Sequence, residues 1–266
     1  MTLLLFKNNL ELKIKRASAL FFFITEVRIF IINKYSLYMA SNHHTDEVFT
    51  PKRKPKNPIK FQLQLNEEQK LAKALIVENP VVVLKGMAGS GKTLVAVQAA
   101  LDMLFSREVE KIVITRPTVA KEELGFLPGD LKEKMDPWLA PIYHNLYMLY
   151  GKDKVDKEIE YGNIEIVPFA FMRGRTFVNA FVIVDEAQNV TQDQMETVLG
   201  RLGKGSKMVI CGDLAQIDLK VKKETGFSFL TRVEEQVKGF RVFALKANHR
   251  HEIVAPILKV YQDFRD

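Results

Sequence analysis

The stretch that decides the fold reads Val81-Val82-Val83-Leu84-Lys85-Gly86-Met87-Ala88-Gly89-Ser90-Gly91-Lys92-Thr93-Leu94-Val95-Ala96-Val97. Its first four residues are apolar and three of them are β-branched, which predicts a strand buried on both faces. Residues 86–93 fit the pattern G-x-x-x-x-G-K-[ST] of a phosphate-binding loop. Apolar residues then recur at the period of a helix, at Leu94, Val97, Leu101 and Leu104. The loop therefore lies between a strand and a helix, the context that supports the motif.

The composition of this loop suits a polyphosphate. Glycine lets the backbone turn its N–H groups toward one phosphate chain and approach it closely, and the amino end of the following helix adds partial positive charge. Lys92 can bridge the β- and γ-phosphates, and the Thr93 hydroxyl can hold Mg²⁺. A glycine-rich turn could match by chance, but the flanking strand and helix argue against that. We expect ATP to contact Gly86, Met87, Ala88, Gly89, Ser90, Gly91, Lys92 and Thr93.

A second decisive stretch reads Phe181-Val182-Ile183-Val184-Asp185-Glu186-Ala187-Gln188. It predicts a buried strand that ends in two carboxylates. Asp185 is placed to hold Mg²⁺ through water, and Glu186 at the same edge can polarise the attacking water as general base. Paired carboxylates on a surface usually serve solubility alone, but these follow a buried strand downstream of a phosphate loop. We therefore expect them to act in catalysis.

Four more apolar runs predict strands, at 111–115, 164–167, 207–211 and 240–245. Parallel α/β sheets bind ligands at the carboxyl ends of their strands. Arg116 and Gln216 follow two of these strands, and Gln216 is a natural sensor for the γ-phosphate. Arg173 and Arg175 lie in a predicted loop. Strands alternating with helices predict an α/β fold with a mostly parallel sheet and helices on both faces.

The first predicted helix opens at Asn66, a plausible N-cap, with Gln69 three residues later as in a capping box. Gln69 could also read adenine, because it lies just before the first strand of a nucleotide-binding fold, and the capping role alone accounts for it about as well. An apolar face is expected at Leu71, Leu75 and Ile76. Further helices are expected at 138–149 and 253–264.

Charge and cysteine content narrow the class of protein. The 266 residues carry a formal net charge of +7 from 39 basic and 32 acidic side chains. Residues 1–60 hold 11 basic and 4 acidic side chains, so residues 61–266 hold 28 of each sign. Any nucleic-acid site on the folded part must therefore be a local patch. The single cysteine, Cys211, excludes an internal disulfide framework and fits a reducing, cytoplasmic location.

The amino-terminal region divides into two parts. In residues 1–38, Glu26 and Arg28 interrupt apolar runs that fall short of the roughly 20 residues of a membrane span, so no membrane partner is expected. A signal peptide is possible, but Met39 resembles an ordinary start, and residues 1–38 are better explained as an over-extended gene start. Residues 40–60 form a basic, proline-containing arm, predicted to be disordered. We expect 1–60 to be this arm and 61–266 to be the ATPase domain.

The motifs together resemble the PhoH family of phosphate-starvation-inducible ATPases, which are related to superfamily-1 helicases. The resemblance runs from about Leu65 to the end of the chain and rests on the phosphate loop together with Thr115-Arg116-Pro117, Leu124-Gly125-Phe126-Leu127-Pro128-Gly129-Asp130, Met172-Arg173-Gly174-Arg175-Thr176-Phe177, Asp185-Glu186-Ala187-Gln188-Asn189, Gly212-Asp213 with Gln216, and Arg250-His251. It implies a single RecA-like core that uses ATP and Mg²⁺, of the stand-alone type common in bacteriophages, and a role as a predicted RNA helicase.

Two functions from different classes follow from these observations. The first is an ATPase that couples hydrolysis to remodelling of RNA or single-stranded DNA, with Arg116, Arg173 and Arg175 as nucleic-acid contacts. The second is a nucleotide-binding regulatory or assembly module with little turnover. The chain leaves no room for a second core after the first, so we expect a homo-oligomer in the form of a ring. The resemblance makes Arg250 a candidate finger on the γ-phosphate, although it could also cap a helix or pair with Glu252.

Overall fold

The computed structural model describes residues 61, 63–117, 131–217, 225–247, 249 and 251–264, with backbone alone at 131–138, 255, 258–259 and 262–263. Six strands in this part of the chain form one sheet, and they are β1 (Val81–Gly86), β2 (Lys111–Arg116), β3 (Ile164–Pro168), β4 (Ala180–Val184), β5 (Lys207–Gly212) and β6 (Phe240–Leu245). Each of the six lies where an apolar run predicted a strand, within a residue or two at either end.

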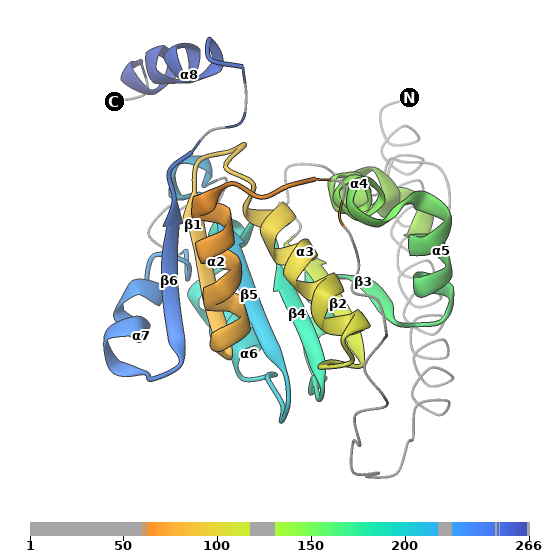
Figure 1. Ribbon diagram of the computed structural model, residues 1–266. Helices are drawn as coiled ribbons and strands as arrows, with labels where there is room; N and C mark the ends of the chain where they lie inside the picture. The colour runs from red at the N-terminus through yellow and green to blue at the C-terminus, as the bar shows by residue number, and fades with distance from the viewer. Residues whose placement is uncertain are drawn as a thin grey trace, which may run out of the picture. The chain divides into compact units, whose positions relative to one another are not determined.

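Every pairing in the sheet is parallel, and the strand order is β3-β2-β4-β5-β1-β6. The carboxyl ends of the strands therefore lie along one edge, the upper edge in Figure 1. Strand β5 separates β1, which leads into the phosphate loop, from β4, which leads into the two carboxylates. Loops from distant parts of the sequence consequently meet at this edge.

Helices cover both faces of the sheet. Figure 1 shows α2 (Glu67–Glu78) and α3 (Lys92–Phe105) across one face, with α4 (Leu131–Tyr150) and α5 (Lys152–Glu160) beside them. Their buried side chains join one face of the strands in a single core. The opposite face packs on α6 (Gln192–Leu199) and α7 (Leu230–Gln236) through a second core. The last helix, α8, spans Val254–Asp263.

Local sequence explains three of the helix starts in the described residues. Asn66 and Gln69 form a complete capping box at the start of α2, as predicted, and Thr191 and Gln194 form a second one at the start of α6. Helix α3 begins at Gly91, whose left-handed φ of 85° is a conformation that glycine adopts readily. The predicted apolar face of α2 was wrong at Leu71, which is 61% exposed. Alanine and glutamine side chains join Ile76 on the buried face instead.

The fold class predicted from the sequence is confirmed as an α/β RecA-like core, with an all-parallel sheet in the described residues and helices on both sides. Cys211 is fully buried in β5, as its apolar surroundings indicated, and burial raises the pKa of its thiol well above the usual value. Among the helices in the described ranges, none combines the length and the apolar character needed to cross a membrane.

Candidate active site

The phosphate loop connects β1 to α3 at the carboxyl edge of the sheet. Gly86 is confined there, because a Cβ would lie 2.4 Å from the carbonyl oxygen of Leu245 in β6. Gly89 and Gly91 both have a φ of 85°, so the loop uses glycine where the backbone must turn sharply. Lys92 donates from Nζ to the carbonyl oxygens of Gly86 at 2.7 Å and Met87 at 3.0 Å. Its ammonium group thus lies over the loop that is predicted to hold phosphates.

Thr93 and Asp185 meet directly beneath this loop. The Thr93 hydroxyl donates to Asp185 Oδ1 at 2.7 Å, although the two residues are 92 positions apart in the chain. Asp185 is only 4% exposed, and its pKa is raised by burial and, to a smaller extent, by the negative charge of Glu186. A hydroxyl and a buried carboxylate in contact are the oxygen ligands that a hard cation prefers.

The donor set fits a magnesium ion that shares its coordination with a nucleotide. Within the described residues, no cluster of three or more His, Cys, Asp or Glu side chains could hold a metal ion by itself. Thr93 and Asp185 would therefore supply the protein's part of the site. Phosphate oxygens and water would supply the remainder, the usual arrangement for Mg²⁺.

Glu186 follows Asp185 in an unusual backbone conformation. Its φ of 51° and ψ of 38° lie in the left-handed region, which costs a residue other than glycine about 1–3 kcal/mol. The surroundings keep its side chain in place: Arg116 Nη2 lies 3.6 Å from Oε1, and Gln188 donates from Nε2 to Oε2 at 2.6 Å. Arg107 and Asn179 also have a positive φ, so the case for a chemical role of Glu186 rests on its place beside Asp185 and not on strain alone.

Gln188 links Glu186 to the loop after β5. Its side chain is buried, and its Oε1 accepts a hydrogen bond from the Asp213 backbone N–H at 3.0 Å. Its Nε2 also lies 3.3 Å from the carbonyl oxygen of Gln216. Sequence analysis assigned no role to Gln188. Its position as the last residue of the Asp-Glu-Ala-Gln run was the available signal.

Asp213 is a second residue without an assigned role in the sequence analysis, although the pair Gly212-Asp213 belongs to the motifs of the family resemblance. Its Oδ2 accepts from the Ala88 backbone N–H of the phosphate loop at 3.0 Å and from Gln216 Nε2 at 2.6 Å. The predicted γ-phosphate sensor, Gln216, therefore lies at the loop through Asp213. One chain of hydrogen bonds now connects Glu186, Gln188, Asp213 and the phosphate loop.

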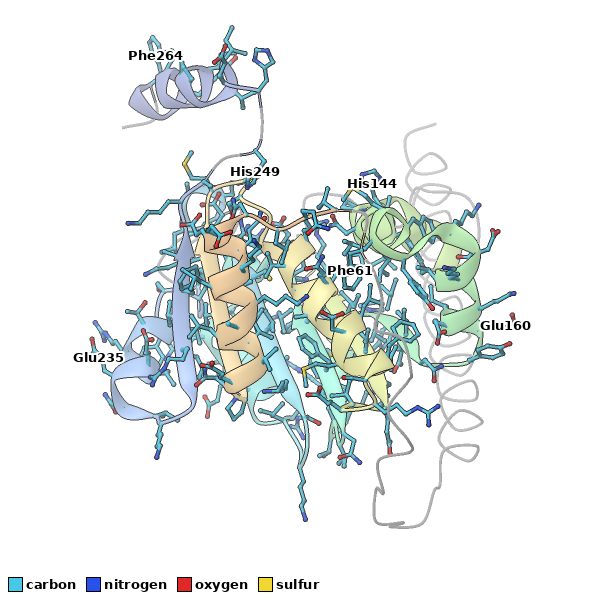
Figure 2. The ribbon with its side chains drawn as sticks, viewed as in Figure 1. Phe61, His144, Glu160, Glu235, His249 and Phe264 are labelled. Carbon is cyan, nitrogen blue, oxygen red and sulfur yellow. The ribbon has the colours of Figure 1, made fainter. Side chains whose placement is uncertain are left out.

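Gln69 also lies against the phosphate loop. Its Nε2 donates to the carbonyl oxygen of Ser90 at 3.2 Å, and its Oε1 accepts from the Asn66 N–H at 3.2 Å. The same Nε2 is 3.1 Å from Nε2 of His249, which Figure 2 shows at this end of the molecule. Gln69 thus caps the helix and contacts the loop. Arg250, the candidate finger, lies outside the described residues.

The three arginines predicted to contact nucleic acid have different environments. Arg116 lies beside Glu186. Arg175 donates to both carboxylate oxygens of Glu165, at 2.8 and 2.6 Å, and its guanidinium lies 5.2 Å from the centre of the Phe177 ring. Arg173 is exposed. The structure therefore brings only Arg116 into the carboxylate site.

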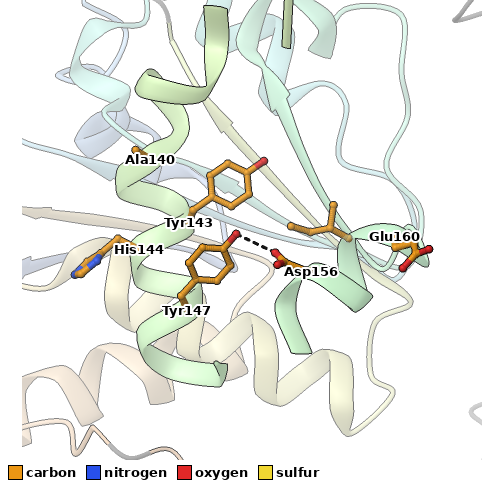
Figure 3. A pocket seen from close by; sticks show the side chains of 7 residues that line it. Ala140, Tyr143, His144, Tyr147, Asp156 and Glu160 are labelled. Atoms are coloured by element: carbon orange, nitrogen blue, oxygen red, sulfur yellow. Dashed lines mark hydrogen bonds between the residues drawn. The ribbon is translucent and has the colours of Figure 1, made fainter. Parts of the chain in front are cut away.

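A groove of about 720 Å³ lies elsewhere, between α4 and α5 (Figure 3). Tyr147 donates from its hydroxyl to Asp156 at 2.9 Å there, and Glu160 adds a second carboxylate. Acidic side chains beside aromatic rings would repel a polyphosphate. The nucleotide site is therefore expected at the loop between β1 and α3 and not at this groove.

Comparisons with known proteins identify the family of this chain. The family model described as "PhoH-like protein" matches residues 63–262. A PhoH-like protein of Bacillus subtilis (strain 168) is 46% identical over 191 residues, which cover 71% of this chain and 60% of the relative. Protein PhoH of Escherichia coli (strain K12) is 42% identical over 177 residues, 65% of this chain and 50% of the relative. The chain thus spans between half and three fifths of the length of these relatives.

Solved structures with some similarity include a Pif1 helicase from Candida albicans, 19% identical with a TM-score of 0.40, covering 77% of this chain and 45% of that one. The large terminase of a thermophilic bacteriophage is 11% identical with a TM-score of 0.40, covering 68% of this chain and 46% of the terminase. The family model matches residues 63–262, which include the phosphate loop and the Asp-Glu-Ala-Gln run. The chain belongs to the family of PhoH-like proteins.

Proposed function

We propose that this protein is a magnesium-dependent ATPase that couples hydrolysis to remodelling of RNA or single-stranded DNA. One observation carries the proposal: the hydroxyl of the loop residue Thr93 is bonded to the buried Asp185, with Glu186 next in the chain. Thr93 lies in the first turn of α3, which follows β1, whereas the two carboxylates follow β4. Strands β1 and β4 are not neighbours in the sheet, and the fold nevertheless brings these groups together at the phosphate loop.

The proposed residues have separate roles in the reaction. The loop N–H groups and Lys92 bind the phosphates, and Thr93 with Asp185 would hold Mg²⁺, which would supply positive charge next to the transferring phosphate. Glu186 takes a proton from water as the water oxygen attacks the γ-phosphorus and the bond to the ADP oxygen breaks. Gln216 reports on the γ-phosphate. Before it can act as a base, Glu186 must turn an oxygen from Arg116 or Gln188 toward that water.

The decisive experiment measures ATP binding and hydrolysis on the wild type and two variants. Lys92→Ala removes a main charge partner of the γ-phosphate, so binding or hydrolysis should be lost. Glu186→Gln removes the base and keeps the shape, so ATP should still bind while hydrolysis falls by about 10²–10⁴-fold. Normal turnover by Lys92→Ala would refute the assignment. A loss of less than about tenfold in Glu186→Gln would show that another group is the base.

A nucleotide-binding module with little turnover is the second candidate, and the contacts of Glu186 favour it. Both of its carboxylate oxygens already have partners, Arg116 at 3.6 Å and Gln188 at 2.6 Å, and these partners compete with an attacking water for the carboxylate. Hydrolysis rates with and without RNA or DNA separate the two functions. Strong stimulation favours the remodelling ATPase, and a low rate that nucleic acid does not change favours the module.

Assembly into a homo-oligomeric ring, with ATP at the boundaries between copies, belongs to the same proposal. A head-to-tail interface closes into a ring when the rotation between copies permits. Exposed apolar side chains on and beside α8 support association, namely Ile253, Ile257, Val260, Tyr261 and Phe264. Arg250 would then reach the γ-phosphate of a neighbouring copy or of its own.

A further inference from the structure

The segment that follows β6 lies across the amino end of α2. Backbone N–H groups of Ala247 and Lys246 donate to the two carboxylate oxygens of Glu68, at 3.0 and 2.8 Å, and these bonds lower the pKa of that carboxyl. The N–H of His249 donates to the carbonyl oxygen of Gly89 at 3.1 Å. This segment therefore joins α2 to the phosphate loop a few residues before α8 begins.

The imidazole of His249 completes the junction. Its Nε2 lies 3.1 Å from Gln69 Nε2 and 3.1 Å from Asn66 Nδ2. Other partners fix the orientation of both amides, because Asn66 Oδ1 accepts from the Gln69 N–H at 2.8 Å and Gln69 Nε2 also donates to the Ser90 carbonyl oxygen. Both amides therefore present N–H to the ring. Nε2 must accept, and the ring proton is on Nδ1.

Gln69 has little freedom to move away from this arrangement. Its side chain is buried, and a Cβ on Gly91 would lie 2.4 Å from its Nε2, so the amide fits closely against the phosphate loop. One N–H of the amide is bonded to Ser90, and the other points to His249. Its Oε1 accepts one hydrogen bond from Asn66 and has a second lone pair. Gln69 thus directs one donor to His249 and carries an acceptor lone pair on the same amide.

That pair of groups complements adenine. Adenine presents a ring-nitrogen acceptor beside an amino donor, and a glutamine amide matches both, whereas the corresponding edge of guanine presents two acceptors. His249 Nε2 supplies the same acceptor as the adenine ring nitrogen. We propose that the adenine base of ATP and the His249 imidazole compete for the same N–H of Gln69, so that base binding displaces His249 and loosens the contacts of Lys246 and Ala247 with α2. This inference rests on the proposed ATP binding.

The competition would have two consequences. ATP must displace His249, so the intrinsic affinity for ATP is multiplied by the fraction of molecules in which the ring has left Gln69. Displacement of the ring would also shift the backbone of His249, which lies a few residues before α8. Recognition of the base would then be transmitted toward that helix as a conformational change. A phosphate chain without a base binds the loop and leaves His249 in place.

The first test compares ATP with inorganic tripolyphosphate by calorimetric titration. His249→Ala removes the competitor, so it should tighten ATP binding by about three- to tenfold, the value of one net hydrogen bond, and leave tripolyphosphate binding unchanged. His251→Ala is the matched control, because that exposed ring accepts only from the nearby Ile253 N–H among the described contacts. The control should bind both ligands as the wild type does. Weaker ATP binding in His249→Ala would overturn the proposal.

The second test uses the wild-type protein and does not depend on a variant. Hydrogen exchange of the Lys246, Ala247 and His249 amides should accelerate with ATP and not with tripolyphosphate. Equal acceleration by both ligands, or protection by ATP, would overturn the competition. If neither ligand binds in a manner that Lys92→Ala abolishes, the proposed function itself fails. If both bind and exchange is unchanged, only the present inference fails.

Discussion

Asp185 is the residue whose environment conflicts most with its charge. Burial withdraws water from its carboxylate, and the neighbouring Glu186 adds a second negative charge, so its pKa is raised. The Thr93 hydroxyl and Arg116 oppose this shift without cancelling it. The folded protein therefore holds a carboxylate that a bound cation would stabilise, and it does so at a cost in stability.

Replacing Asp185 by Asn should stabilise the protein in the absence of Mg²⁺. A raised pKa in the folded protein means that the stability from Asp185 is present at low pH and is lost as pH rises through the folded-state pKa. The variant does not titrate, so its advantage in melting temperature over the wild type should increase from acidic to neutral pH. Melting curves in a chelator across this range measure it. An advantage that shrinks with rising pH would contradict the prediction.

At this scale the sequence identified the residues that its motifs name. Lys92, Thr93, Asp185 and Glu186 were predicted and lie together at one edge of the sheet. No role was predicted for Asp213, because its contact with Ala88 joins residues 125 positions apart and depends on β5 lying beside β1. Local pattern carries no information about such a contact. The roles themselves remain predictions until the variants are measured.

At the scale of elements, the loops after β4 and β5 behave as one unit. The Gln188 side chain connects them by two hydrogen bonds: its Nε2 donates to Glu186, and its Oε1 accepts from the Asp213 N–H. The Thr225 hydroxyl also donates to the Gln188 carbonyl oxygen at 2.7 Å, which fixes the backbone of the first loop. A movement of Gln216, the predicted γ-phosphate sensor, would therefore change the position of Glu186, the predicted base.

Gln188→Ala should separate catalysis from binding. Glu186 would lose the partner that orients it, so we expect kcat to fall by about tenfold or more, part of the 10²–10⁴-fold worth of a general base, with a smaller change in the KM for ATP. Gln192→Ala, at an exposed position of α6, is the control and should change neither. Steady-state kinetics and melting curves measure both variants. A rise in KM with kcat unchanged would show that Gln188 serves binding instead.

The sequence predicted the strands more completely than the helices. All six strands were predicted, because buried parallel strands are continuous apolar runs. Helices α5, α6 and α7 were not. Helix α5 is highly charged and has only two apolar side chains, Val155 and Ile159, so its apolar face is too short to be conspicuous, and α7 is only 7 residues long. Helix α6 did carry a signal, the Thr191 and Gln194 capping box.

At the scale of the molecule, exposed positive charge decides where nucleic acid can bind. Arg173→Ala should weaken binding of single-stranded RNA or DNA. It should also lower the number of counterions released on binding by about one, which is measured as a shallower slope of log affinity against log salt concentration. Arg175→Ala should chiefly lower the melting temperature, because Glu165 would lose a bidentate partner. Fluorescence anisotropy at several salt concentrations measures the binding. Equal losses of affinity in both variants, with no change in melting temperature, would contradict this order.

The last prediction concerns association of whole molecules. The apolar side chains of α8 include Val260 and Tyr261, 54% and 63% exposed, and Phe264 follows the helix at 86%. Contiguous apolar side chains on a helix commonly mark an interface, and we expect a second copy of the chain to cover them. Light scattering with an ATP analogue should then show a mass above that of one chain.

Ile257→Ser combined with Val260→Ser should lower that mass, whereas Leu71→Ser, at an exposed apolar position of α2, should leave it unchanged. Mixing inactive Arg250→Ala and Lys92→Ala subunits tests whether the site is shared. Recovery of hydrolysis would place Arg250 across the interface, because each mixed boundary could then combine one intact loop with one intact arginine. A strict monomer that hydrolyses ATP at the full rate would contradict the ring, since its single copy would already hold every group that the reaction needs.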